Sequence, residues 1–185
     1  TCAILDNQDI TCWGANSHGQ LGTGNTSLIG DSPDEIGDGL PIIAASHSSA
    51  TSPPASLALG WDHTCVLFEN GTVTCWGSNA HGQLGIESTT TIGDQPGDMG
   101  DSLLQVALPS GRTATQVTAG DGFTCALLDN SEVACWGKND KGQMGIGTTS
   151  NQGDSAGEMG DSLTTVDLSY NCLLYTSPSP RDVSR

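Results

Sequence analysis

The chain has 185 residues, with 21 Asp or Glu against five Lys or Arg, so its formal net charge at pH 7 is −16. Lys and Arg contacts to phosphates supply most non-specific affinity for nucleic acids, so an acidic chain without a basic patch argues against DNA, RNA and anionic membranes as direct partners. Aromatic residues make up 4% of the chain and glycine occurs 25 times, a composition that favours short strands and tight turns over helices.

The sequence contains one pattern three times. A cysteine is followed ten residues later by Cys-Trp-Gly and then by Asn-x-x-Gly-Gln-(Leu or Met)-Gly, in copies that begin at Cys2, Cys65 and Cys125. A period of about 60 residues indicates a modular array, because one such unit cannot bury its apolar face without stacking on a neighbour. Residues 44–54, rich in Ala, Ser, Thr and Pro, are expected to form an exposed loop inserted in the first repeat. Within the array of residues 1–171, the three expected repeats cover about 1–55, 56–114 and 115–171.

Each repeat is predicted to hold four short strands. An extended segment such as 56–59 leads through a glycine-rich corner into the hairpin that joins the two cysteines, and a segment such as 103–108 closes the repeat. Both faces of the second hairpin are apolar, with Leu67 on one side and Val66 and Trp76 on the other. A strand that is apolar on both faces lies between two sheets, as in adjacent blades of a propeller. The sequence therefore predicts an all-β fold, an incomplete β-propeller with blades of four-stranded antiparallel sheets.

The spacing of the paired cysteines predicts cross-strand disulfides. If residues 69–71 form a three-residue hairpin loop with Gly71 in the left-handed region, Cys65 lies opposite Cys75 at a non-hydrogen-bonded position, where side chains are closest. Such a site suits a bridge, which needs Cβ atoms about 3.5–4.5 Å apart. Reduced structural thiols remain the alternative, whereas zinc is disfavoured because its motifs usually need Cys-x2–4-Cys spacing. The predicted pairs are Cys2–Cys12, Cys65–Cys75 and Cys125–Cys135.

The state of the cysteines also bears on the compartment. Paired cysteines favour an extracellular or secretory location, because disulfides persist in oxidising compartments, whereas unpaired cysteines favour the cytoplasm or nucleus. Sequons for N-glycosylation at Asn25 and Asn70 are compatible with secretion, although such triplets also arise by chance. At the hairpin position of Gly71, the other copies hold Gln8 and Ser131, which adopt the left-handed region less readily than glycine.

The Asn-x-x-Gly-Gln-Leu-Gly segment is rich in glycine and so is similar to a phosphate-binding loop, but we interpret it as a structural turn. Glycine permits positive φ and close approach of strands, and Asn and Gln bond exposed backbone groups. Its occurrence in every copy indicates blade architecture rather than a single site. The expected turn residues are Gly19, Gln20, Gly22, Gly82, Gln83, Gly85, Gly142, Gln143 and Gly145.

Ten of the acidic residues cluster in the loops that follow this turn. Closely spaced oxygen ligands on a glycine-rich loop suit Ca²⁺, the one cofactor that we consider. The alternative is a solvated connection in which the acidic side chains cap short turns. The candidate ligands are Asp94, Asp98, Asp101, Asp154, Glu158 and Asp161, in register with Asp31, Asp34, Glu35 and Asp38.

Two Gly-Asp-Ser-Leu quartets, beginning at Gly100 and Gly160, match the nucleophile signature of a lipase family. A serine hydrolase needs one nucleophile with a positioned His and Asp, whereas this match is repeated and the first copy has Gly39 in place of the serine. We therefore expect no catalytic residues and no enzymatic activity. The four histidines, which we interpret as structural or loop residues, are His18, His47, His63 and His81.

Residues 60–67 and 71–85 carry a family resemblance. Their pattern, Gly-x-x-His-Thr-Cys-x-Leu and Gly-x-Val-x-Cys-Trp-Gly-x-Asn-x-x-Gly-Gln-Leu-Gly, resembles the regulator of chromosome condensation repeat, the unit of seven-bladed β-propellers. The resemblance implies a rigid disc whose loops recognise another protein, so we expect a non-catalytic scaffold for protein–protein interaction with a partner of unknown identity.

The same resemblance implies other functions. One is guanine-nucleotide exchange on a small GTPase, and another is a regulatory propeller in ubiquitin ligation. The paired cysteines, which the founding nuclear member of the family lacks, weigh against a nuclear protein. They leave a Ca²⁺-dependent extracellular binding module as a third hypothesis.

Residues 172–185 do not follow the repeat. The stretch from Cys172 to Asp182 resembles, codon for codon, a translated transposase adapter used to build sequencing libraries, so we interpret the tail as non-native rather than as a Ser/Pro linker. Without Cys172 the cysteines fall into three pairs of equal spacing. Because the chain begins inside the first repeat, we also expect a fragment of a longer protein, holding fewer than three blades.

Overall fold

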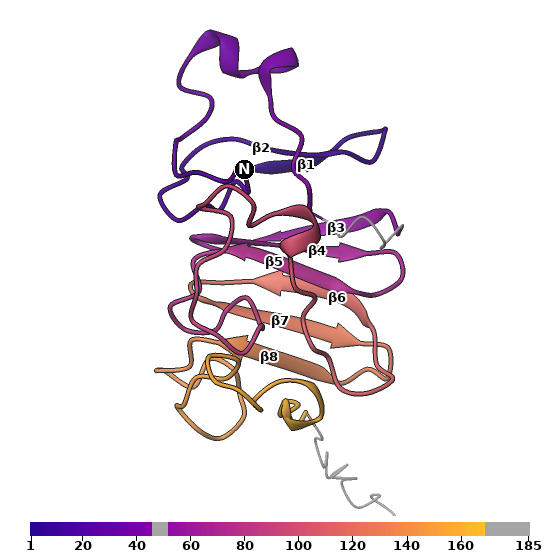
Figure 1. Ribbon diagram of the computed structural model, residues 1–185. Coiled ribbons are helices and arrows are strands. Elements are labelled where there is room, and N and C mark those ends of the chain that lie inside the picture. The colour runs from indigo at the N-terminus through magenta and orange to yellow at the C-terminus, as the bar shows by residue number, and fades with distance from the viewer. Residues whose placement is uncertain (46–51, 169–185) are drawn as a thin grey trace, which may run out of the picture.

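A computed structural model of the chain describes residues 1–45 and 52–168. The predicted tail at 172–185 and His47 lie outside the described residues. The described part contains eight strands in three antiparallel sheets and four single-turn 3-10 helices (Figure 1), and the prediction of an all-β fold is confirmed. None of the helices found there has the length and apolar character needed to cross a bilayer.

Consecutive strands are neighbours in every sheet, so each sheet is a meander. The first sheet pairs β1 (Cys2–Ile4) with β2 (Ile10–Cys12). The second contains β3 (Pro54–Leu59), β4 (His63–Phe68) and β5 (Val73–Gly77), and the third contains β6 (Ala114–Ala119), β7 (Phe123–Leu128) and β8 (Val133–Gly137). The short helices are η1 (Pro33–Glu35), η2 (Gly37–Gly39), η3 (Gly100–Ser102) and η4 (Gly160–Ser162).

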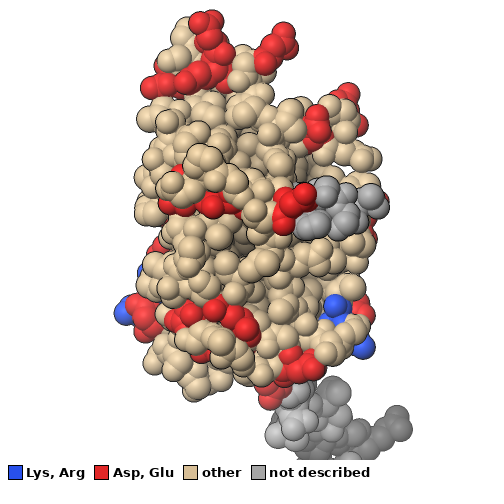
Figure 2. Space-filling model, viewed as in Figure 1, with Lys and Arg blue, Asp and Glu red and all other residues tan. Residues whose placement is uncertain are grey.

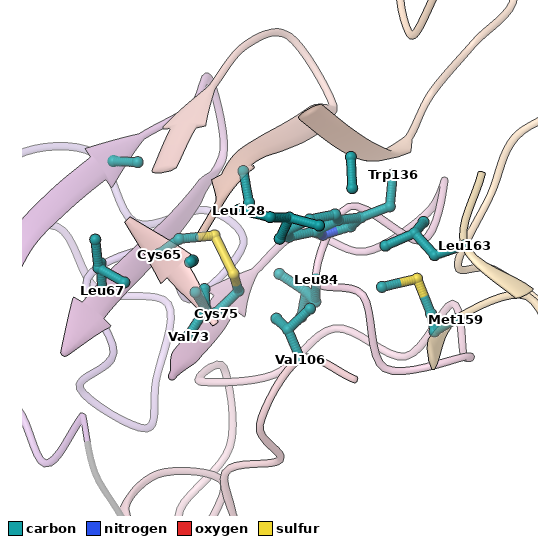
Figure 3. Packing of buried hydrophobic residues seen from close by; sticks show 14 residues of the cluster. Cys65, Leu67, Val73, Cys75, Leu84, Val106, Leu128, Trp136, Met159 and Leu163 are labelled. Atoms are coloured by element: carbon teal, nitrogen blue, oxygen red, sulfur yellow. A yellow bond between two sulfur atoms is a disulfide. The ribbon is translucent and has the colours of Figure 1, made fainter. Parts of the chain in front are cut away.

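The three sheets stack face to face (Figure 1), as adjacent propeller blades do. Every residue of β4 is buried, because its two faces pack against different neighbours. Leu67 belongs to a core shared with Trp136 of the third sheet (Figure 3), whereas Val66 and Trp76 belong to a core shared with Ile10 of the first. The predicted burial of the hairpin on both faces is therefore confirmed.

The turn between β4 and β5 has the geometry predicted for residues 69–71. The Phe68 N–H donates to the Thr72 carbonyl at 2.9 Å, and the Gly71 N–H donates to the Phe68 carbonyl at 2.8 Å. Gly71 has φ of 78°, and the equivalent residues Gln8 and Ser131 have φ of 72° and 69°. The two non-glycine residues thus hold a left-handed conformation that costs an L-residue energy.

Among the described residues the sheets have at most three strands, and the segment predicted as the fourth strand of each blade joins its sheet through an isolated bridge. Residues 103–108 follow β5 but form a single bridge with it, between Gln105 and Thr74. The chain leaves η3 immediately before this segment, and the Leu108 N–H bonds back to the Val106 carbonyl at 3.1 Å. Too few extended residues remain between these turns to build a ladder, and the third repeat has the same arrangement.

Candidate functional site

All three predicted cysteine pairs are disulfides in the structure. The partners lie directly opposite each other in their hairpins, with Cα atoms 4.1 Å apart in the first two pairs and 4.0 Å apart in the third. Each bridge joins two strands of one sheet, so it stabilises a blade without linking it to the next. The cysteines therefore belong to the scaffold.

The Asn-x-x-Gly-Gln-Leu-Gly segments are turns built around a buried asparagine. In each copy its Oδ1 accepts the N–H of the residue five positions later, at 2.9–3.0 Å, and its Nδ2 donates to carbonyls of the following loop. The Gln side chain accepts the N–H two residues before it, at 2.9 Å in all three copies. These bonds satisfy the backbone of the turn and give its polar residues a structural role.

The main-chain carbonyl of the turn glutamine joins neighbouring blades. The Gln20 carbonyl accepts the Thr64 hydroxyl at 2.9 Å and the Trp76 indole N–H at 3.1 Å. The next joint has the same bonds, to the Gln83 carbonyl from Thr124 at 2.9 Å and Trp136 at 3.0 Å. The tryptophan of every Cys-Trp-Gly after the first is thus an inter-blade donor, which accounts for its repetition.

The glycine before that glutamine lies against the neighbouring blade. Gly19 has φ of 70°, and a Cβ there would collide with the backbone nitrogen of Asp94. Gly142 has φ of 71°, but a Cβ there would meet only the Thr148 carbonyl, at 4.0 Å. Glycine is therefore required at position 19 for conformation and for space. Gly82 lies in the same way against Asp154 of the third repeat, whereas Gly142 belongs to the last repeat of the chain.

His63 lies in the second joint and is 1% exposed. Its Nε2 is 2.9 Å from the Thr124 hydroxyl, which donates its own proton to the Gln83 carbonyl, so Nε2 carries the hydrogen. Nδ1 is buried without a hydrogen-bond partner. Burial lowers the pKa of His63 from 6.5 to about 4, so the ring is neutral at pH 7. This environment gives the side chain a packing role.

Three equivalent acidic side chains cap turns in the loops. Glu35 accepts the Gly30 N–H at 2.8 Å, a bond that lowers the pKa of its carboxyl. Asp98 accepts the Gly93 N–H at 2.9 Å, and Glu158 accepts three consecutive backbone N–H groups at 2.9–3.1 Å. The structure thus shows for these three residues the capping role that the sequence analysis gave as the alternative to calcium binding.

Two of the other candidate calcium ligands bind different groups. Asp161 accepts the N–H and hydroxyl of Ser110, which lower the pKa of Asp161, and Asp154 accepts the Asn151 amide at 3.1 Å. Acidic side chains form separate patches over the loops in Figure 2. Within residues 1–45 and 52–168, no three His, Cys, Asp or Glu side chains gather as a metal site. Calcium binding therefore stays a prediction.

The most exposed large apolar side chain of the described part is Trp61, at 79%, in the corner between β3 and β4. It lines two small hollows, one of about 130 Å³ with His63 and one of about 110 Å³ with Asp121 and Lys138. The Lys138 ammonium lies 3.4 Å from the Asp121 carboxylate. The arrangement offers an aromatic surface beside charged groups, which suits contact with another macromolecule.

Trp61 was not predicted as a site, because the repeat pattern treats its position as variable. The third copy has Asp121 there. The difference between the copies could have pointed to Trp61. Packing between blades does not explain a large, apolar and exposed residue that occurs in one copy and not in the other.

Comparisons with known proteins agree with the repeat architecture. Profiles of the regulator of chromosome condensation (RCC1) repeat match residues 55–83 and 114–143 in one form and residues 11–67 and 70–127 in another. The ultraviolet-B receptor UVR8 of Arabidopsis thaliana is 29% identical over 80% of this chain and 29% of its own length. The secretion-regulating guanine nucleotide exchange factor of Mus musculus is 27% identical over 82% of this chain and 32% of its own length.

A solved structure has the same fold. The crystal structure of yeast RCC1 (Prp20), bound to Kap60, superposes with a TM-score of 0.54 and 23% sequence identity, covering 88% of this chain and 34% of that one. The chain thus spans about a third of the length of these relatives. Its three sheets correspond to part of a propeller.

Proposed function

The chain belongs to the regulator of chromosome condensation repeat family, and we propose that it is a non-catalytic β-propeller scaffold that binds a protein partner through the loops around Trp61. The observation that carries this proposal is the 79% exposure of Trp61, on a frame in which Trp76 of the same blade and Trp136 of the next blade are fully buried. Tryptophan is enriched among the residues that dominate binding energy at protein interfaces.

The surroundings of Trp61 support a defined contact surface. The backbone N–H of Trp61 donates to the Gly120 carbonyl of the next blade at 3.3 Å, so the backbone is anchored while the ring is exposed. Asp62 is held by the Gln20 amide at 3.1 Å, with the ring of His18 at 3.6 Å from its carboxylate. A surface with rigid polar neighbours loses little conformational entropy on binding.

The test begins with a photoreactive phenylalanine analogue at position 61 and, as control, at position 104, where Leu104 is 59% exposed. A protein that cross-links from position 61 alone would then be purified and titrated by calorimetry. We expect Trp61→Ala to weaken its binding about 30-fold, the effect of a hot-spot residue, and Leu104→Ala to change it less than threefold. Equal affinity of the Trp61→Ala and native proteins would contradict the proposal.

Nucleotide exchange is a second candidate function, because one relative is named a guanine nucleotide exchange factor. Release of fluorescent GDP from purified small GTPases tests it. Faster release in the presence of the chain would support exchange. Binding of a GTPase without faster release would support the scaffold function instead.

We also propose that the protein resides in an oxidising compartment, extracellular or secretory. The three disulfides support this location, because cytosolic reductants keep most thiols reduced. Alkylation of the protein in denaturant without reductant, followed by mass measurement, tests the proposal, because most of the hairpin cysteines are buried in the folded protein. The six cysteines of the hairpins should stay unmodified, and their alkylation would refute the proposal.

A further inference from the structure

The hairpin turns of the three blades hold asparagine at one equivalent position, and its amide has different partners in different copies. In copies one and three, Nδ2 donates to an acidic residue two positions later, from Asn7 to Asp9 at 2.8 Å and from Asn130 to Glu132 at 2.7 Å. In copy two the corresponding residue is Thr72. The amide nitrogen of Asn70 therefore has no carboxylate in that place.

Thr72 binds the other end of the Asn70 side chain. Its hydroxyl donates to Oδ1 at 2.8 Å and its N–H donates to the same oxygen at 3.1 Å. Among the described residues, no hydrogen bond engages Nδ2 of Asn70, although its backbone N–H bonds the Ser52 hydroxyl at 3.0 Å. The turn thus holds the carbonyl end of the amide, while the nitrogen has no hydrogen-bond partner among the described residues.

We propose that Asn70 is an acceptor site for an N-linked oligosaccharide. Asn70-Gly71-Thr72 is an Asn-x-Thr sequon without proline, on an exposed hairpin turn. The donor is a lipid pyrophosphate-linked oligosaccharide. The amide nitrogen forms a bond to C1 of the first sugar, the bond from C1 to the pyrophosphate oxygen breaks, the lipid pyrophosphate leaves, and the amide loses one proton to a base.

The position of the turn leaves room for a glycan. Turns of the β4–β5 and β7–β8 hairpins lie on the same edge of the stacked sheets, to the right in Figure 1, away from the faces that pack against each other. Glu69 and Asn70 are both exposed, whereas Gly71 is buried against Thr113 of the next blade. An oligosaccharide on Asn70 therefore displaces none of the contacts between blades.

The second sequon, at Asn25, has a different environment. Its Nδ2 donates to the Thr23 carbonyl at 3.3 Å. The carbonyls of Asn25 and Ser27 both accept from the buried Asn16 amide, at 2.8 and 2.9 Å. Because this loop is tied to the core of the turn and its amide nitrogen already has an acceptor, we expect lower occupancy at Asn25 than at Asn70.

The inference rests on the oxidising compartment proposed above, because secretion brings a chain to both the disulfide-forming and the glycan-transferring machinery. The experiment is expression of the full chain, with a cleavable secretion signal, in a eukaryotic host. An amidase that removes N-linked glycans, used in water enriched in heavy oxygen, converts each occupied asparagine to a labelled aspartate. The label separates occupied Asn70 from spontaneous deamidation of the Asn70-Gly71 pair in ordinary water.

We expect the label at Asn70 in most secreted molecules, and loss of one glycan from Asn70→Gln and from Thr72→Ala. A matched variant, Glu132→Thr, places the same sequon in the third hairpin and should gain a second glycan at Asn130. Unlabelled Asn70 in secreted protein with all six hairpin cysteines protected would overturn the site while leaving the compartment intact. Free cysteines in the secreted protein would instead count against the compartment. Labelled Asn25 beside unlabelled Asn70 would also overturn the site.

Discussion

Replacing His63 with phenylalanine should remove a specific acid sensitivity from the joint between the second and third blades. The substitution has a precedent in the chain, because Phe123 occupies the equivalent position of the third repeat. A Cβ at Gly60 would collide with the His63 ring, just as a Cβ at Gly120 would collide with the Phe123 ring. The two aromatic rings thus lie in similar places against a glycine, and phenylalanine should fit.

The magnitude follows from the two pKa values of the side chain. In the folded protein the pKa of His63 is about 4, and the ordinary value is 6.5. Because the folded pKa is the lower one, the unfolded chain binds the proton first as the pH falls. Stability from the neutral ring is fully present above pH 6.5 and is lost progressively toward pH 4. At about 1.4 kcal/mol per pH unit, the loss reaches about 3 kcal/mol.

The assay is urea denaturation of the native and His63→Phe proteins at pH 7 and pH 4.5. The carboxyl groups also titrate in this range, but they are common to both proteins, so the difference between the two pH dependences isolates His63. We expect the native protein to lose about 2–3 kcal/mol more than His63→Phe between these pH values. At pH 7 the variant should lose only the bond to Thr124, about 1 kcal/mol. Identical pH dependence in the two proteins would refute a buried, neutral His63.

Three further predictions concern the hairpins, the joints and the loops. Ser131→Gly should stabilise the protein by about 1 kcal/mol in urea denaturation, because a φ of 69° is strained for serine. Gly71→Ala should destabilise the protein, because a Cβ at position 71 would collide with Thr113. Thr124→Val should lower the free energy of unfolding by about 1–3 kcal/mol, because His63 Nε2 and the Gln83 carbonyl both lose a hydrogen-bond partner. Its control is Thr11→Val, which should be neutral or stabilising, because the Thr11 hydroxyl is buried without a hydrogen-bond partner. Equal costs in these two variants would contradict the assignment of the joint. Calcium chloride should leave the melting temperature unchanged if Asp98 and Glu158 keep their bonds to backbone N–H groups, and a rise in melting temperature that saturates with calcium would support the calcium hypothesis.

The hairpins could be predicted from sequence because their determinants are local. Turn length and the glycine at position 71 place Cys65 opposite Cys75, and apolar residues on alternate positions reveal that both faces are buried. The segment 103–108 was misleading, because its apolar residues favour a buried strand, and Leu103 and Val106 are indeed buried although the segment is not a strand. Their spacing of three, with two exposed residues between them, matches a bent segment better than the spacing of two that a pleated strand requires.

The joint between blades could not be predicted in the same way. Its acceptors are main-chain carbonyls, of Gln20 and Gln83, and every residue has a carbonyl, so no residue type marks them. The capping role of Asp98 has a similar origin, because a carboxylate that binds backbone N–H groups and one that binds calcium have the same sequence pattern. In both cases the distinction depends on which backbone groups the fold leaves without partners.

Differences between the copies separate packing from function. His63 and Phe123 differ in chemistry, but both rings lie against a glycine. The joint between blades therefore accepts either aromatic ring at this position. Trp61 and Asp121 differ at an exposed corner, where neither side chain is buried between blades. The repeated residues described above stabilise single blades or the joints between them, so an exposed, large apolar residue that is not repeated is the better candidate for binding a partner. Trp61 meets that condition in the described part of the chain, and the proposed binding surface is centred on it for this reason.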